Sequence, residues 1–136
     1  MQPNPYGAYR RVQTQTASPA QLVLHLYEAL LRDLARAEQQ LGLAQIEASH
    51  ASLVHAQDIV MELVAGLDLD AGEIAQQLAD LYHYMYGRLV EANVRKDRRA
   101  IHEVLTLVER IHAAWEQVVQ TTPSTPTPVM TRSVRA

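Results

Sequence analysis

The residues best suited to chemistry in this sequence are its six histidines, two of which follow a glutamate at the spacing Glu-x-x-His. Glu47 precedes His50 in this way, and Glu109 precedes His112. In di-iron carboxylate bundles, two such pairs join single glutamates from the two remaining helices to hold a pair of metal ions. The spacing therefore makes a di-iron centre the first chemical hypothesis.

The positions of the two pairs along their expected helices argue against that centre. Glu47 lies in the first turn of its helix, whereas Glu109 lies about eleven residues into its own. Because these two helices run parallel in the topology expected below, the offset is roughly 14 Å at the usual helical rise. Glu109 also lies off the apolar row of its helix, at the solvent edge. We therefore expect no metal site and no cofactor.

No other arrangement of residues resembles an active site. The sequence holds no nucleophile motif, no Gly-rich phosphate loop and no His-Glu-x-x-His motif. One dense basic cluster, Arg95-Lys96-Asp97-Arg98-Arg99, fits a solvated turn where positive charge at a helix end is favourable. A contact with an acidic partner is the alternative reading of that cluster. The net charge of −3 argues against a dedicated nucleic-acid binder. We expect a protein that is not an enzyme.

The composition is that of a helical protein with one core. Apolar residues make up 48% of the 136 residues, and Phe and Cys are absent, so Leu, Ala, Val and Ile carry the packing. Without Cys there are no disulfides and no thiolate metal sites. The first residues do not resemble a signal peptide, and no stretch approaches the ~18 continuous apolar residues of a membrane span. These features predict a cytoplasmic protein without a membrane span.

Four segments show the apolar periodicity of amphipathic helices, with spacings that alternate between three and four residues. Ser18 is the expected cap of the first helix and Gly42 its stop. A capping box formed by Asp70 and Glu73 marks the start of the third, and the fourth begins near Asp97. The expected core rows are, in order, Val23, Tyr27, Leu30, Leu34, Ala37 and Leu41; Ile46, Ser49, Leu53, Ala56, Val60, Leu63 and Leu67; Ile74, Leu78, Leu81, Met85, Leu89 and Ala92; and Ile101, Val104, Val108, Ile111, Trp115 and Val118.

Connections of about four to six residues make neighbouring helices antiparallel. The predicted fold is therefore all-α, an up-down-up-down four-helix bundle over residues 18–120. We expect residues 1–17 to form an extended N-terminal segment. Residues 121–136, rich in Pro and Thr, are expected to be a disordered tail.

The third helix carries a second apolar row beside its core row. Its members lie mostly about 70–150° from the core row, and the second helix adds a weaker outward row. Two such rows on neighbouring helices form a groove suited to an amphipathic helix of a partner. The residues of this candidate groove are Val54, Met61, Ala65, Ala79, Tyr82, Tyr86 and Val90. The same residues are also consistent with wide flanks of the core or with a homodimer face. Tyr82 fits a core flank, whereas Tyr86 and Val90 point too far out for one.

Several stretches of the sequence resemble the flagellar secretion chaperone FliS family. TASPAQLVLHLYEA (16–29) is similar to the element that opens the family's first helix, and AQDIVMEL (56–63) to its second-helix motif. GEIAQQLADLYHYM (72–85) and RLVEAN (88–93) resemble its most recognisable stretch, and Glu103-Val104 with Ala114-Trp115 fits the fourth helix. His83 and Gly87 depart from the family, which commonly has Asp and Arg at these positions.

This resemblance implies a bacterial, cytosolic chaperone of flagellum assembly that binds flagellin for type III secretion. In the family, the disordered C-terminal segment of flagellin wraps around the bundle, which blocks premature polymerisation and keeps the subunit competent for export. The N-terminal segment lies over the apolar cleft when no client is bound; Tyr9 matches its motif and Tyr6 lies three residues before. Other flagellar proteins are further expected partners. The alternative is a self-associating structural bundle whose groove forms a homodimer interface.

Overall fold

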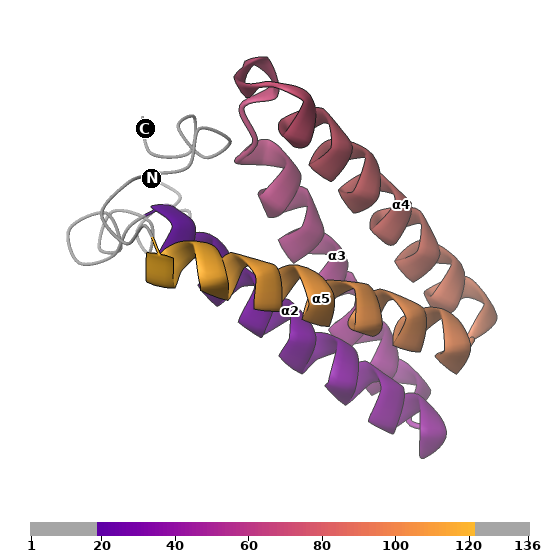
Figure 1. Cartoon of the computed structure of the whole chain (residues 1–136). Coiled ribbons are helices and arrows are strands. Elements are labelled where there is room, and N and C mark those ends of the chain that lie inside the picture. The colour runs from indigo at the N-terminus through magenta and orange to yellow at the C-terminus, as the bar shows by residue number, and fades with distance from the viewer. Residues whose placement is uncertain (1–18, 122–136) are drawn as a thin grey trace, which may run out of the picture.

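The computed structural model describes residues 19–121, which form four α-helices and one short 3-10 helix (Figure 1). In chain order the elements are α2 (Pro19–Gly42), α3 (Ile46–Ala65), η1 (Leu69–Ala71), α4 (Glu73–Arg95) and α5 (Arg98–Thr121). These residues contain no strand, and none of their helices is long and apolar enough to cross a membrane. The all-α four-helix bundle is confirmed. Ser18, the N-terminal segment 1–17 and the tail beyond Thr121 lie outside the described residues.

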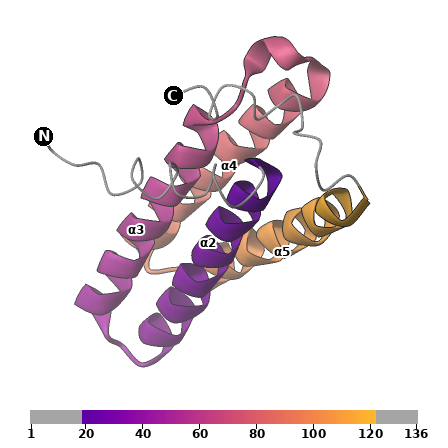
Figure 2. The same ribbon diagram turned by 90° about the vertical axis from the view of Figure 1, so that its left-hand side faces the viewer.

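The helices pack as a ring in which α2 contacts α3 and α5, and α4 also contacts α3 and α5. We call the end at which α2 begins and α5 finishes the terminal end of the bundle. At the opposite end, α4 and α5 are joined by a short turn at Lys96 and Asp97 and lie close together. Toward the terminal end these two helices diverge, so the first turns of α4 stand apart from the last turns of α5 (Figures 1 and 2).

Three aromatic residues from three helices meet in the core. The hydroxyl groups of Tyr27 on α2 and Tyr82 on α4 share a hydrogen bond of 2.5 Å. Trp115 on α5 lies edge-on to Tyr27, with ring centroids 6.3 Å apart and an interplanar angle of 61°. Burial raises the pKa of Tyr82 to about 12 and raises the pKa of Tyr27 well above its ordinary value, because the charged phenolate is poorly solvated there.

The raised pKa values predict alkaline unfolding. A pKa that is raised in the folded state contributes stability below the unfolded value of about 10, and that stability is lost as pH rises through the folded value. Titration of Tyr82 alone should cost roughly 2 kcal/mol of stability by about pH 12.

Urea unfolding at several pH values from about 8 to about 12 measures this loss of stability. These limits lie about two units on either side of the ordinary tyrosine pKa. With no Cys and Lys96 as the single lysine, tyrosines dominate titration in this range. The double variant Tyr27→Phe/Tyr82→Phe should lose much less stability between these limits; an equally steep loss would contradict the assignment.

The expected core row of the third helix is wrong at Ile74, whereas Leu78 and Leu81 are half-buried and pack against the core. Ile74 is 66% exposed, whereas Ala79 and Tyr82 from the second apolar row are buried, as is Ala75 one turn before Ala79. Two long-range features decide this orientation. The hydroxyl of Tyr82 finds its partner, Tyr27, inside the core, and α5 diverges from the start of α4, the part of the helix where Ile74 is exposed. Later in the helix the expected row is buried at Met85, Leu89 and Ala92.

The ends of the helices follow the sequence signals with one exception. α2 ends at Gly42, and Asp97 caps α5 by accepting a hydrogen bond from the backbone N–H of Arg99 at 2.9 Å. The capping box of Asp70 and Glu73 does not form. Instead, Asp68 accepts a hydrogen bond from the backbone of Asp70 and opens η1, and Gly72, with φ of 130°, separates that turn from α4. Only glycine adopts this backbone conformation readily. The helix α4 therefore begins directly after Gly72, at Glu73.

Gly87 offers a stabilising substitution. It lies exposed in α4, and a Cβ atom built on it would meet nothing within 4 Å. Because glycine in a helix interior is about 1 kcal/mol less favourable than alanine, Gly87→Ala should raise the free energy of unfolding by about that amount. Urea unfolding measures the gain; a loss of stability would mean that the helix is strained at this position.

Candidate functional site

The sequence places the candidate groove on the second and third helices, which are α3 and α4. These helices pack against each other, and the side-chain amide of Asn93 on α4 donates a hydrogen bond of 2.9 Å to His50 on α3. Val54 lies about one turn beyond His50, and Val90 lies about one turn before Asn93. Because the helices run antiparallel, Val54 and Val90 lie at the same level, on either side of the line where the helices meet.

A strip of exposed apolar side chains follows this line, and we call it the outer seam. Its residues are Ile46, Val54, Met61 and Ala65 on α3, with Val90 and Val94 on α4. Ile46, Val54 and Met61 are eight and seven residues apart, close to two helical turns each, so they lie on one side of α3. Met61 is 41% exposed and Val94 is 76% exposed. The seam is therefore a long apolar surface rather than a single exposed residue.

The candidate groove residues divide into three groups. Val54, Met61, Ala65 and Val90 are exposed on the outer seam. Tyr86 was expected to point too far out for a core flank, and this expectation is wrong because its side chain is half-buried and packs against the core. Ala79 and Tyr82 were expected to line the groove, and this expectation is wrong because both are buried, with Tyr82 only 2% exposed. At these two positions the row faces into the bundle, where Tyr82 bonds to Tyr27. Tyr6 and Tyr9 lie outside the described residues.

Sequence reasoning missed two seam residues. Ile46 was expected in the core, yet as the first residue of α3 it is 46% exposed. Val94 belongs to neither apolar row of α4, although it lies one turn after Val90 and extends that residue's exposed face. The four-residue spacing from Val90 is the signal that would have found it.

Gln57 adds a polar feature beside the seam. It lies on α3 between Val54 and Met61, and its side-chain oxygen is buried without a hydrogen-bond partner among the described residues. Leaving a buried acceptor unpaired costs about 1–3 kcal/mol. A bound segment that offered an N–H group here would recover part of that cost.

The two Glu-x-x-His pairs do not form a common site. His50 bonds to Asn93, and the Nε2 atom of His112 lies 3.2 Å from a carboxylate oxygen of Glu28 on α2. Glu109 is exposed, as its position off the apolar row predicts. Over residues 19–121, no three or more His, Asp or Glu side chains are placed to hold a metal ion.

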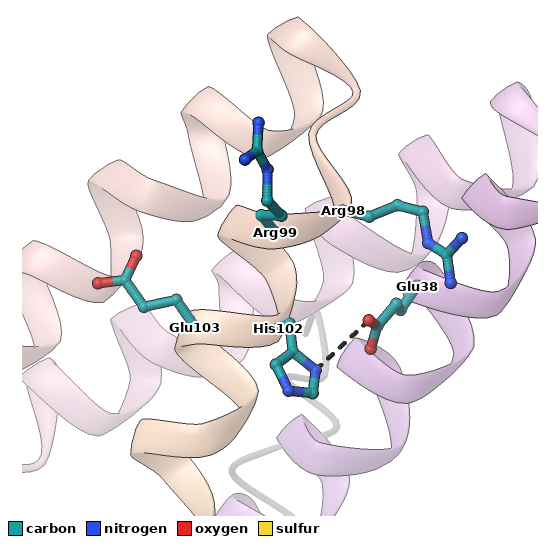
Figure 3. Close-up of a pocket in the computed structure, with 5 residues that line it drawn as sticks. All are labelled: Glu38, Arg98, Arg99, His102 and Glu103. Atoms are coloured by element: carbon teal, nitrogen blue, oxygen red, sulfur yellow. Dashed lines mark ion pairs between the residues drawn. The ribbon is translucent and has the colours of Figure 1, made fainter.

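A separate hollow lies between α2 and the start of α5, away from the seam (Figure 3). Charged or titratable side chains line it: Glu38, Arg98, Arg99, His102 and Glu103. His102 lies 3.4 Å from Glu38, while the side chain of Arg99 is 97% exposed. None of these lining residues belongs to the candidate groove that the sequence predicts.

Arg88 and Tyr84 on α4 fix the neighbouring part of the α4–α5 contact. Arg88 donates hydrogen bonds to Glu103 at 2.8 Å and to Glu91 at 2.7 Å, and the hydroxyl of Tyr84 donates to Glu103 at 2.5 Å. These donors, Tyr84 first and Arg88 second, lower the pKa of Glu103. The network stabilises the bundle where α4 and α5 lie close, not at the terminal end.

Comparison with known proteins places the chain among flagellar proteins. Residues 2–122 match the family model described as Flagellar protein FliS. The flagellar secretion chaperone FliS of Salmonella typhimurium is 39% identical over 117 residues, which cover 82% of this chain and 87% of that protein. The protein of the same name from Bacillus subtilis is 35% identical over 117 residues, covering 86% of this chain and 87% of that protein. Flagellar secretion chaperone FliSB of Pseudomonas aeruginosa is 33% identical over 107 residues, covering 78% of this chain and 85% of that protein.

Proposed function

Because the chain belongs to the FliS family of flagellar secretion chaperones, we propose that it binds the C-terminal segment of flagellin in the cytosol. In this proposal, binding prevents premature polymerisation and keeps flagellin competent for type III export. The mechanism is coupled folding and binding: a segment without fixed structure becomes partly helical on the bundle and covers apolar surface there.

The observation that carries this proposal is the outer seam. Val54, Met61 and Val90 are apolar, partly exposed and aligned along two packed helices. A soluble protein rarely leaves a long apolar surface bare without a use for it. Anchor residues spaced by whole helical turns suit an amphipathic helix laid along the line between α3 and α4, and a methionine adapts to the shape of what it contacts.

Co-purification tests the proposal. The full-length protein should retain intact flagellin and should lose flagellin that lacks its C-terminal segment. Equal retention of both forms would contradict binding through that segment. Light scattering of the protein alone tests the homodimer alternative, because a dimer held by the seam should dissociate when Met61 is replaced by Glu.

We also propose that residues 1–17 act as a lid over the client surface in the free protein. Tyr6 and Tyr9 are aromatic residues on a short tether ahead of Pro19, where α2 begins. A tethered segment competes at high effective concentration, and a lid lowers the apparent affinity for the client by the fraction of time it is closed.

Deletion of residues 1–12 is the test of this lid. The truncated protein should bind more apolar dye or self-associate more, because apolar surface is uncovered. Its affinity for flagellin, measured by calorimetry, should stay the same or become tighter. A loss of more than about tenfold in affinity, some 1.4 kcal/mol, would instead show that the segment contacts the client directly.

A further inference from the structure

A second apolar surface lies at the start of α4, on a different side of that helix from the outer seam. Ile74 is 66% exposed, and Leu78 and Leu81 are half-buried. These three residues are four and three apart, so they share one side of the helix, and we call them the α4 row. The same helix side continues to Met85 in the core. The α4 row lies in the first half of α4, where α5 diverges from α4 toward the terminal end of the bundle (Figures 1 and 2).

The half of the bundle around this row is strongly acidic. We take this half as residues 19–30, 56–84 and 110–121, which run from the helix midpoints to the terminal end. Its charged residues are eight acids and one base, namely Glu28, Asp58, Glu62, Asp68, Asp70, Glu73, Asp80 and Glu116, with Arg110. The other half of the bundle holds seven Asp or Glu and seven Arg or Lys. The negative charge of the helices is thus concentrated at the terminal end.

The chain beyond α5 has the opposite character. Residues 122–136, which we call the tail segment, contain Arg132 and Arg135 and no acidic residue. They also contain the apolar pair Val129 and Met130, preceded by three prolines. The tail segment starts directly after Thr121, the last residue of α5, and therefore at the acidic end of the bundle.

We propose that the tail segment folds back against the start of α4. Val129 and Met130 cover the α4 row, and Arg132 and Arg135 lie beside the carboxylates of the acidic half. Glu73 and Asp80, which are exposed and seven residues apart on one side of α4, are the nearest of these to the α4 row in sequence.

The length of the tail segment permits this contact. Residues 122–128 span roughly 22 Å in the extended conformation that prolines favour, at about 3.1 Å per residue. Residues 110–121 of α5 span roughly 18 Å at the helical rise. The tail segment can therefore return along the half of α5 that faces the diverging start of α4 and deliver its apolar pair to the α4 row.

Charge favours this occupant over a second copy of the chain. Two copies that met through their acidic halves would bring like charges together, which opposes association. The tail segment instead brings positive charge to an acidic surface at the high local concentration of a tethered ligand. This contact forms in the free protein and does not depend on the proposed binding of flagellin.

Paramagnetic labelling of the full-length protein tests the proposal. The sequence has no cysteine, so Ser133→Cys provides a single site for a nitroxide spin label between the two arginines. In protein labelled with nitrogen-15, the amide signals of Ile74, Leu78 and Leu81 should lose most of their intensity. The intensity should return with Arg132→Glu/Arg135→Glu, and also at ~1 M salt, where the screening length is about 3 Å.

Three other results would overturn the proposal, and each is distinct. Loss of intensity confined to the last turn of α5 would mean that the tail segment does not reach α4. The same loss at the α4 row from a label at Gln2→Cys, and not from the label at position 133, would make the N-terminal segment the occupant. Loss that appears only when spin-labelled protein is mixed with separate nitrogen-15-labelled protein would identify a second copy.

Discussion

Replacing Met61 by Glu should weaken the binding of flagellin by at least about tenfold while leaving the bundle folded. Met61 is 41% exposed in the free protein, so a carboxylate is tolerated there as long as it faces water. A bound helix would cover this position and desolvate the new carboxylate. The variant would also lack the stabilisation of about 1.5–3 kcal/mol that fully burying the methionine side chain contributes. Calorimetric titration measures the change in affinity, and circular dichroism checks that the helices remain.

Ala113→Glu is the matched control for this variant. Ala113 is exposed on α5, a helix that contributes no residue to the outer seam, and it receives the same charge in the same kind of element. Flagellin binding should be unchanged in this variant. If both variants weaken binding equally, net charge rather than the outer seam governs the interaction. If Met61→Glu alone leaves affinity intact, the seam is not the client surface.

The largest expected loss of stability follows from Tyr27→Ala. Tyr27 is fully buried, bonds to Tyr82 and contacts the ring of Trp115. Truncating a buried aromatic residue to alanine costs about 3–5 kcal/mol, and the hydroxyl of Tyr82 left without a partner adds about 1–3 kcal/mol. Small domains are stable by only about 5–15 kcal/mol, so this variant should be partly unfolded at ordinary temperature.

Urea unfolding followed by circular dichroism measures this effect. The control Tyr27→Phe keeps the ring and its edge-on packing against Trp115 but removes the hydroxyl and its hydrogen bond to Tyr82, so it should cost about 1–3 kcal/mol. A Tyr27→Ala variant that loses only about 1 kcal/mol, the typical effect of a single substitution, would show that the aromatic cluster does not hold α2, α4 and α5 together.

Much of the fold follows from local pattern. The row from Val23 to Ala37 faces the core as its spacing predicts, Gly42 ends α2, and Asp97 precedes α5. These features depend on residues within a few turns of one another, which is why periodicity and capping rules find them.

The orientation of α4 could not be predicted in this way. Its first half carries two apolar rows, and helical spacing alone makes Ile74 as good a core residue as Ala75. The choice depends on Tyr27, 55 residues away from Tyr82 in sequence, and on the course of α5. Asp33 is a similar case: it is buried in α2, where it pairs with His55 of α3, and no local pattern marks it.

The candidate site was predictable in part for the same reason. Val54, Met61, Ala65 and Val90 lie on the exposed sides of helices whose core rows are unambiguous at those points. Tyr82 was placed with them because it belongs to the row whose direction depends on distant contacts. The binding role of the outer seam itself is a prediction that rests on its exposure and alignment.

The most direct test of the central claim is a calorimetric titration of the isolated C-terminal segment of flagellin into the full-length protein at several temperatures and salt concentrations. The segment should bind on its own, gain helix as measured by circular dichroism, and show a negative heat-capacity change, because apolar surface is buried when it folds onto the bundle. Binding should survive added salt, because Val54, Met61 and Val90 are apolar. An absence of binding, or binding with a heat-capacity change near zero that salt abolishes, would contradict the account.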